Sequence, residues 1–216
     1  MMKRFRVCAL LAVASLFLSS CQSMYYGAME KVGVHKRDIL VDRVEDARDS
    51  QEDAKEQFKD ALEQFTSVVA FDGGDLAVKY DKLSHSFERC TADAEEVRSR
   101  IKKVESVADA LFKEWESELE DYSNPRLRRA SEQKLRTTRE KYGQLRASMR
   151  KAARTMDPVL AAFQDQVLFL KHNLNARAIA SIEDEAGRVE AEVERLVRDM
   201  ETSIAEANAF VREMGL

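Results

Sequence analysis

The sequence has few of the residues that usually form turns, with 7 Gly and 2 Pro among 216 residues. A chain with so few turn-formers cannot change direction often, so its secondary-structure elements must be long. Charged residues make up 34% of the chain and hydrophobic residues 44%, while aromatic residues are only 7%. This composition is rich in helix-forming residues and predicts a single domain of long helices.

Cysteine and histidine are also scarce, and their spacing excludes several kinds of site. Three Cys cannot build a disulfide framework, and no CxxC or Cys/His spacing of a metal site occurs. None of the three His (His35, His85 and His172) follows a Glu by three positions, so the Glu-x-x-His pattern of di-iron bundles is missing. We interpret each His as a solvent-facing or helix-end residue.

Motifs for catalysis are absent as well. The sequence has no Gly-rich phosphate loop, no Gly-x-Ser-x-Gly elbow and no His-Glu-x-x-His helix. We therefore expect a protein that is not an enzyme, with no catalytic residue, metal, cofactor or small-molecule substrate. The net charge of −4 is too small to indicate a nucleic-acid partner.

The first residues have the pattern of a secretory signal. Three basic residues among the first six are followed by an apolar run from Val7 to Leu18. This run is too short to span a bilayer but has the length of a signal-peptide core. It leads into Leu-Ser-Ser-Cys at residues 18–21, which resembles the lipobox of bacterial lipoproteins.

The lipobox resemblance implies that residues 1–20 are a lipoprotein signal peptide and that Cys21 becomes the lipidated N-terminus. Diacylglycerol would be joined to the Cys21 sulfur by a thioether, and the amine would be acylated. Each buried CH₂ contributes about 0.8 kcal/mol, so several acyl chains together anchor a protein stably. In lipoproteins of this kind an Asp after the Cys favours the inner membrane, so Gln22 predicts the periplasmic face of the outer membrane. The alternative is an ordinary secretory signal with an incidental Cys.

Residues 21–35 are expected to tether the lipidated Cys to the first helix. Tyr25 and Tyr26 suit the membrane interface, where aromatic rings lie among lipid headgroups. Alternatively, both rings pack on the end of the folded domain.

Residues 36–216 show the spacing of coiled-coil helices. The clearest helix contains Tyr80–Trp115, where apolar or small residues alternate in steps of three and four over about five heptads. The same rhythm predicts helices from about Lys36 to Ala70, from Pro125 to about His172, and from Ile179 to Met214. The stripe of the clearest helix consists of Tyr80, Leu83, Phe87, Cys90, Ala94, Val97, Ile101, Val104, Ala108, Leu111 and Trp115.

Two stripe positions carry polar or reactive side chains. Gln51 interrupts the stripe of the first helix, and a polar residue at such a position more often fixes helix register than binds a ligand. Cys90 is the one thiol left after Cys8 is removed and Cys21 is lipidated. Its place in the stripe predicts a small buried residue rather than a reactive site.

Capping residues predict how the helices begin and end. The sequence FDGGD at residues 71–75 predicts a tight reversal, with a Gly in the left-handed conformation and Asp75 capping the next helix. It lacks the spaced oxygen ligands and closing Glu of a calcium loop. The second helix is expected to extend to Tyr122, and Asn124 to cap a third helix that begins at Pro125.

The third helix contains three further signals. The seam stays in phase across Asp157-Pro158, which favours a kinked continuous helix over a restart with Asp157 as the cap. The run Val167-Leu168-Phe169-Leu170 is apolar on every side and predicts deeper burial at this end. Residues 171–175 (KHNLN) predict a turn, with one unbroken helix as the alternative.

Short connections between these helices make neighbours antiparallel. The predicted fold is therefore all-α, an elongated antiparallel helical bundle or coiled coil of three to four long helices. From Arg126 to Arg154 there are eleven basic residues against Glu132 and Glu140, whereas the other helices are acidic. In up-down order the basic helix lies between two acidic helices, which predicts ion pairs between helices. The alternative is a basic face that contacts anionic lipid or lipopolysaccharide headgroups.

Five stretches carry a resemblance that covers nearly the whole chain after the signal. They are residues 33–47 (GVHKRDILVDRVEDA), 71–76 (FDGGDL), 110–115 (ALFKEW), 122–129 (YSNPRLRR) and 166–182 (QVLFLKHNLNARAIASI). In these stretches the chain resembles a bacterial lipoprotein family catalogued only as a domain of unknown function, DUF2959. The resemblance implies no activity, cofactor or partner, so no functional residue is carried over except Cys21.

Two functions of different classes fit this sequence. The first is a structural or protein-interaction scaffold of the bacterial cell envelope, a rod on the outer membrane that presents helical faces to an envelope protein or to its own copies. The second is a lipid-binding or membrane-remodelling module that uses the basic third helix and the apolar Val167–Leu170 end.

Overall fold

The computed structural model describes residues 33, 35–71, 73 and 75–215. The predicted signal peptide (1–20), Cys21 and nearly all of the predicted tether lie outside these residues. In the described part of the chain, four long α-helices and one short 3₁₀ helix follow one another without strands. They are α2 (Lys36–Val69), α3 (Leu76–Glu118), η1 (Leu119–Asp121), α4 (Pro125–His172) and α5 (Ala176–Met214).

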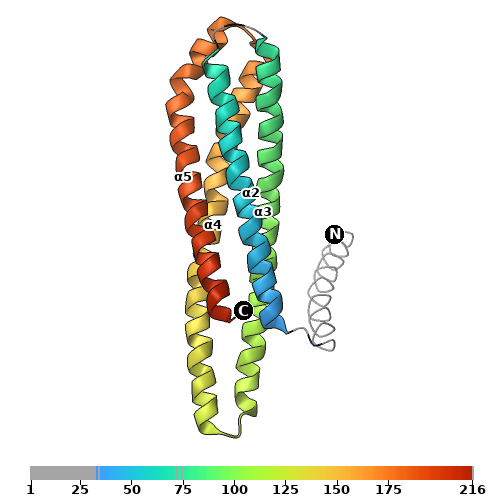
Figure 1. The fold of residues 1–216 in the computed structure, drawn as a ribbon, viewed down its shortest axis with the longest axis vertical. Coiled ribbons are helices and arrows are strands. Elements are labelled where there is room, and N and C mark those ends of the chain that lie inside the picture. Colours follow the sequence, from blue (N-terminus) through green and yellow to red (C-terminus); the bar gives the residue numbers. More distant parts are fainter. Residues whose placement is uncertain (1–32, 34, 72, 74, 216) are drawn as a thin grey trace, which may run out of the picture.

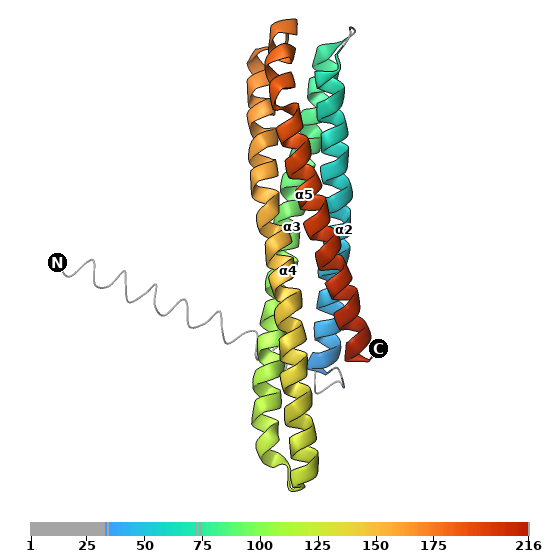
Figure 2. The same ribbon diagram turned by 90° about the vertical axis from the view of Figure 1, so that its left-hand side faces the viewer.

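The four long helices form an elongated antiparallel bundle (Figures 1 and 2). α2 packs against α3 and α5, and α4 packs against the same two helices. Their order around the bundle is therefore α2, α3, α4 and α5, and α5 closes the ring against α2. This arrangement confirms the all-α, up-down-up-down fold predicted from the sequence, with four helices rather than three.

Two of the helices extend past the other two (Figure 1). The Nζ atom of Lys36, at the start of α2, lies 2.7 Å from a carboxylate oxygen of Glu114 on α3. Near the end of α5, Glu213 forms an ion pair with Lys141 on α4. Beyond this level the described chain consists of α3, η1 and α4, and we call residues 115–140 the hairpin. Since α4 begins sixteen residues before Lys141, the α4 arm of the hairpin extends about 24 Å past the end of α5 at 1.5 Å per residue.

The predicted apolar stripes form the core of the bundle. On α3, every residue of the stripe is buried except Tyr80, Phe87 and Trp115, which are half-buried. Phe65 of α2 and Phe163 of α4 are fully buried, with ring centroids 6.4 Å apart. Burying a Phe or Leu side chain contributes about 1.5–3 kcal/mol. The stripes therefore hold the four helices side by side.

Both predicted N-caps are confirmed. The Asp75 carboxylate accepts hydrogen bonds from two backbone N–H groups of α3, at 3.0 and 3.4 Å, and the Asn124 side chain does the same for α4, at 2.9 and 3.4 Å. In the reversal before α3, Gly73 has a φ of +135°, which residues with side chains rarely adopt. One helix end differs from the prediction. α3 ends at Glu118 rather than Tyr122, because its last turn tightens into η1 before the chain reverses.

The predicted continuity of the third helix is confirmed. α4 runs through Pro158 without interruption, so a restart at Asp157 is wrong. Asp157 instead forms an ion pair with Arg98 of α3, at 2.5 Å. α4 ends at His172 and residues 173–175 lead into α5, which confirms the predicted turn and not the unbroken helix.

The predicted deep burial of residues 167–170 is wrong. Leu170 is fully buried, but 57% of Leu168 and 40% of Phe169 are exposed. α4 packs mainly against its two neighbours, so they cover one stripe of its surface and leave the opposite side in solvent. Within the residues that the structure describes, no helix is long and apolar enough to cross a membrane.

Candidate functional site

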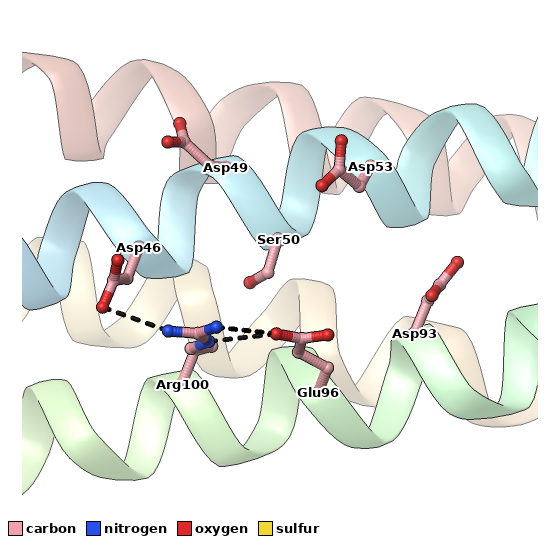
Figure 3. Close-up of a pocket in the computed structure, with 7 residues that line it drawn as sticks. All are labelled: Asp46, Asp49, Ser50, Asp53, Asp93, Glu96 and Arg100. Atoms are coloured by element: carbon pink, nitrogen blue, oxygen red, sulfur yellow. Dashed lines mark hydrogen bonds and ion pairs between the residues drawn. The ribbon is translucent and has the colours of Figure 1, made fainter.

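A cleft of about 170 Å³ between α2 and α3 is lined almost entirely by charged residues (Figure 3). Steps of three and four residues place each set of lining residues on one side of its helix, because such residues are neighbours on a helical surface. We call this site the acidic cleft. α2 supplies Asp46, Asp49, Ser50 and Asp53, and α3 supplies Asp93, Glu96 and Arg100.

Arg100 neutralises one end of the acidic cleft. Its Nη1 atom lies 3.1 Å from Oδ2 of Asp46 on the facing helix, and its Nε and Nη2 atoms donate to Oε1 of Glu96 at 3.1 and 2.8 Å. Figure 3 shows the guanidinium between the two carboxylates. The hydrogen bond to Glu96 is the main cause of the raised pKa of Arg100. Arg100 therefore links α2 to α3 at this point.

The other end of the acidic cleft has an excess of negative charge. Asp93 is half-buried, and this burial is the main reason that the pKa of its carboxyl group is raised. The charges of Asp53 and Glu96 raise the pKa further, while Arg89 opposes the shift. A raised pKa means that the ionised form of Asp93 is less favourable in the folded protein than in the unfolded chain.

Replacing Asp93 with Asn should make the bundle slightly more stable at neutral pH. Because the folded pKa is above the unfolded one, the native state binds more protons between the two values, and the free energy of unfolding falls as pH rises through this window. The gain from Asp93→Asn should therefore vanish below about pH 4. Urea unfolding of the wild type and Asp93→Asn at several pH values measures the difference in the free energy of unfolding. A stability gain that is the same at every pH would contradict a raised pKa of Asp93.

Clustered carboxylates raise the question of a cation site. Among the described residues, however, no three His, Cys, Asp or Glu side chains come together in a way that could hold a metal ion. The acidic cleft instead resembles the charged flank of a coiled-coil interface. There, opposite charges on neighbouring helices select the partner and its register.

The basic part of α4 forms ion pairs with both neighbouring helices, as predicted. Each such pair contributes about 0.2–1 kcal/mol when it is exposed, so the pairs fix the alignment of the helices more than they stabilise the fold. Arg139 and Arg150 pair with Glu116 and Glu105 of α3, and Lys141 and Lys151 pair with Glu213 and Asp199 of α5.

Cys90 is buried, as its stripe position predicts. Its side chain has 0% exposure, and its Sγ atom lies 3.5 Å from the backbone oxygen of Gln57, to which it donates. Burial, helped by the nearby charge of Asp93, raises the pKa of the thiol to about 12. At neutral pH the group is a protonated thiol and a poor nucleophile.

The three His lie where the sequence suggests. His35 directly precedes α2, His172 is the last residue of α4, and His85 is exposed on α3. The Nδ1 atom of His85 lies 2.6 Å from the backbone oxygen of Asp81, one turn earlier. All three are thus solvent-facing or helix-end residues.

Residues 25–214 match the family model described as a protein of unknown function, DUF2959. The chain belongs to this family. A search of curated proteins gives no match. The DUF2959 match begins at Tyr25, before α2, and covers the whole bundle and the hairpin. Since the family has no assigned activity, the function must be argued from the geometry of this chain.

The core of this DUF2959 protein contains a polar layer of which the sequence indicated one member. Gln51 is fully buried, and neither its Nε2 nor its Oε1 atom has a hydrogen-bond partner among the described residues. Ser203 of α5 is also fully buried, and its Oγ atom likewise lacks a partner there. Arg48 of α2 donates a hydrogen bond to the side-chain oxygen of Asn208 on α5, at 3.2 Å. This hydrogen bond fixes how the two helices align, and it places Gln51 and Ser203 at about the same level of the bundle. Ser203 has no signal in the sequence, because Ser is common on both faces of a helix.

Three exposed apolar residues at the end of the bundle were also not predicted. We call Leu168, Phe169 and Leu174 the apolar end; their exposed fractions are 57%, 40% and 42%. They lie on the last turn of α4 and on the connection to α5, at the opposite end of the molecule from the start of α2 (Figure 1). A local apolar run does not reveal how many neighbours cover it, so the sequence suggested burial instead.

Proposed function

We propose that this DUF2959 protein is a non-catalytic scaffold of the bacterial cell envelope. It is anchored by lipidated Cys21 to the periplasmic face of the outer membrane. Its apolar end binds a second protein, either another envelope protein or a copy of itself. The rod holds this partner away from the lipid surface.

The position of the apolar end supports this proposal. Leu168, Phe169 and Leu174 lie within seven residues of the chain and are all exposed, and clustered exposed apolar residues commonly mark an interaction site. α4 alone has 48 residues, a length of about 72 Å at 1.5 Å per residue. α2, the first described helix after the proposed tether, begins at the hairpin end of the bundle, and the apolar end lies at the opposite end (Figure 1).

The ion pairs of α4 favour a scaffold over lipid binding by the basic third helix. Lys141 and Arg150 already face carboxylates of α5 and α3. A broad lipid contact along α4 would have to compete with these pairs. The apolar residues of the proposed lipid-binding face, Leu168 and Phe169, lie beyond the basic stretch rather than within it.

Crosslinking in intact cells, followed by capture of the protein, tests the scaffold. We expect defined crosslinked products in the wild type and a loss of about tenfold in Leu168→Glu/Phe169→Glu, since a change of 1.4 kcal/mol in binding is a factor of ten. The matched control is Gln144→Glu/Ala147→Glu, which adds the same charge to exposed positions of α4. Products that are equal in both variants, or an absence of products with a monomeric protein, would overturn the proposal.

A further inference from the structure

The tip of the hairpin is an exposed surface that combines apolar and basic side chains. All ten residues from 121 to 130 are exposed. Among them, Tyr122 has 40% and Leu127 has 55% of its surface exposed. Arg126, Arg128 and Arg129 lie beside Leu127 in the chain, and the first turn of α4 has no acidic residue.

The arginines at the tip have limited compensation inside the protein. Arg128 pairs with Glu132 at 3.0 Å, and the Nε atom of Arg129 donates to the backbone oxygen of Pro125 at 3.2 Å. Positive side chains near the start of a helix are unfavourable, because the helix dipole is positive there. The first backbone N–H groups of α4 are already bound by Asn124. The side chains, not the helix terminus, are therefore the groups available to a partner.

The tip lies on the membrane side of the molecule if Cys21 is the anchor. α2 begins at the hairpin end of the bundle (Figures 1 and 2). The fifteen residues from Cys21 to His35 can span at most about 50 Å when extended. This reach exceeds the roughly 24 Å by which the α4 arm of the hairpin passes the end of α5, and the α3 arm passes the ion pair of Lys36 and Glu114 by less. A membrane that holds the lipidated Cys21 can therefore meet the tip.

We propose that the hairpin tip enters the phospholipid headgroup layer, an inference that rests on the proposed lipid anchor. Tyr122 and Leu127 place apolar surface at the interface, where amphipathic and aromatic side chains are favoured. Arg126 and Arg129 pair with lipid phosphates, which guanidinium groups bind in a bidentate geometry. The rod then stands on two contacts, the lipid anchor and the tip, with the apolar end directed away from the membrane.

The acidic side chains on the α3 side of the tip limit how deep it enters. Glu118, Glu120 and Asp121 are exposed directly before the turn. Ionised carboxylates are unfavourable in the hydrocarbon region, so insertion stops at headgroup depth. A shallow contact of this kind orients a protein that is already anchored. It is too weak to hold the protein on the membrane without the lipid anchor.

Fluorescence quenching in vesicles tests the orientation. The full lipidated chain with Leu127→Cys is labelled with an environment-sensitive dye and reconstituted into vesicles of phosphatidylethanolamine and phosphatidylglycerol. Cys90 does not label, because it is buried. Brominated lipids should quench this dye several-fold more than the same dye at Leu168→Cys, the matched position in the apolar end. Equal quenching at both positions, or stronger quenching at residue 168, would overturn the proposal.

A charge reversal separates lipid contact from mere proximity. Adding Arg126→Glu and Arg129→Glu to the labelled Leu127→Cys protein should lower the quenching at least by half. Quenching that does not change with both charges reversed would show that the phosphate contacts are not made. If brominated lipids do not quench the dye at residue 127 and its emission changes only when envelope proteins are added, the tip binds a protein partner instead.

Flotation of the vesicles separates this inference from the proposed anchor. If the labelled protein floats with the vesicles but its tip is not quenched, the anchor stands and the tip proposal fails. If the wild-type protein does not float with the vesicles, the proposed anchor itself fails, and the tip proposal fails with it.

Discussion

Replacing Cys21 with Ala is expected to abolish lipid attachment. The lipobox chemistry needs the Cys21 sulfur for the thioether to diacylglycerol, and Ala has no atom that can form this bond. Each CH₂ withdrawn from the bilayer costs about 0.8 kcal/mol, so loss of several acyl chains is an all-or-none change in anchoring. Incorporation of labelled fatty acid should fall to background, and the mass of the purified protein should show that residues 1–20 are retained.

Cys90→Ala provides the matched control for this experiment. It removes another Cys, but one that is buried in the core and cannot meet the lipidating enzymes. Its fatty-acid label should equal that of the wild type. Labelled lipid on Cys21→Ala, or a wild-type chain whose first residue is not Cys21, would contradict the anchor.

Replacing Gln51 with Leu should stabilise the bundle by about 1–3 kcal/mol. A buried polar group without a partner costs about that much in lost hydration, and the Gln51 amide has no hydrogen-bond partner among the described residues. Leu has a similar size and adds apolar surface to a core position that is fully buried. The midpoint of urea unfolding should therefore rise without a change in the slope of the transition.

Gln57→Leu is the control for Gln51→Leu. Gln57 is on the same helix, is half-buried, and donates from Nε2 to Asp60 at 3.4 Å, so it has no comparable desolvation cost to relieve. We expect Gln57→Leu to leave stability unchanged or to lower it slightly. A Gln51→Leu variant with a lower free energy of unfolding would contradict this prediction. It would show that the Gln51 amide has hydrogen-bond partners in solution and that the polar layer stabilises the bundle. A buried polar residue often fixes helix register at a cost in stability, which explains its presence in an otherwise apolar stripe.

Much of the fold could be predicted because it depends on local patterns. The stripe around Cys90 identifies a helix, and Asp75 and Asn124 mark the start of two helices by the hydrogen bonds that their side chains can make. Even the passage of α4 through Pro158 follows from a stripe that stays in phase across that residue. These features need no knowledge of which helix lies beside which.

The features that could not be predicted depend on how far the helices slide past one another. A repeat of seven residues fits equally well after a shift of one heptad, so the sequence leaves open where α2 begins along α3. The length of the hairpin and the meeting of Asp46 with Arg100 depend on such offsets, whereas the exposure of Leu168 depends on how many helices cover α4 at that end. The lipid anchor at Cys21 and the location in the envelope stay predictions.

The place of α2 in the ring has a mechanical consequence. α2 is the helix nearest the tether, and it packs against α3 on one side and α5 on the other along its 34 residues. If the chain is anchored through Cys21 as proposed, a pull along the axis of α2 at its first residue would load both interfaces in shear. Shear strains many contacts of the apolar stripe together, whereas peeling would break them one after another. The bundle is therefore suited to carry tension between the start of α2 and a partner held at its opposite end, as the proposed function requires.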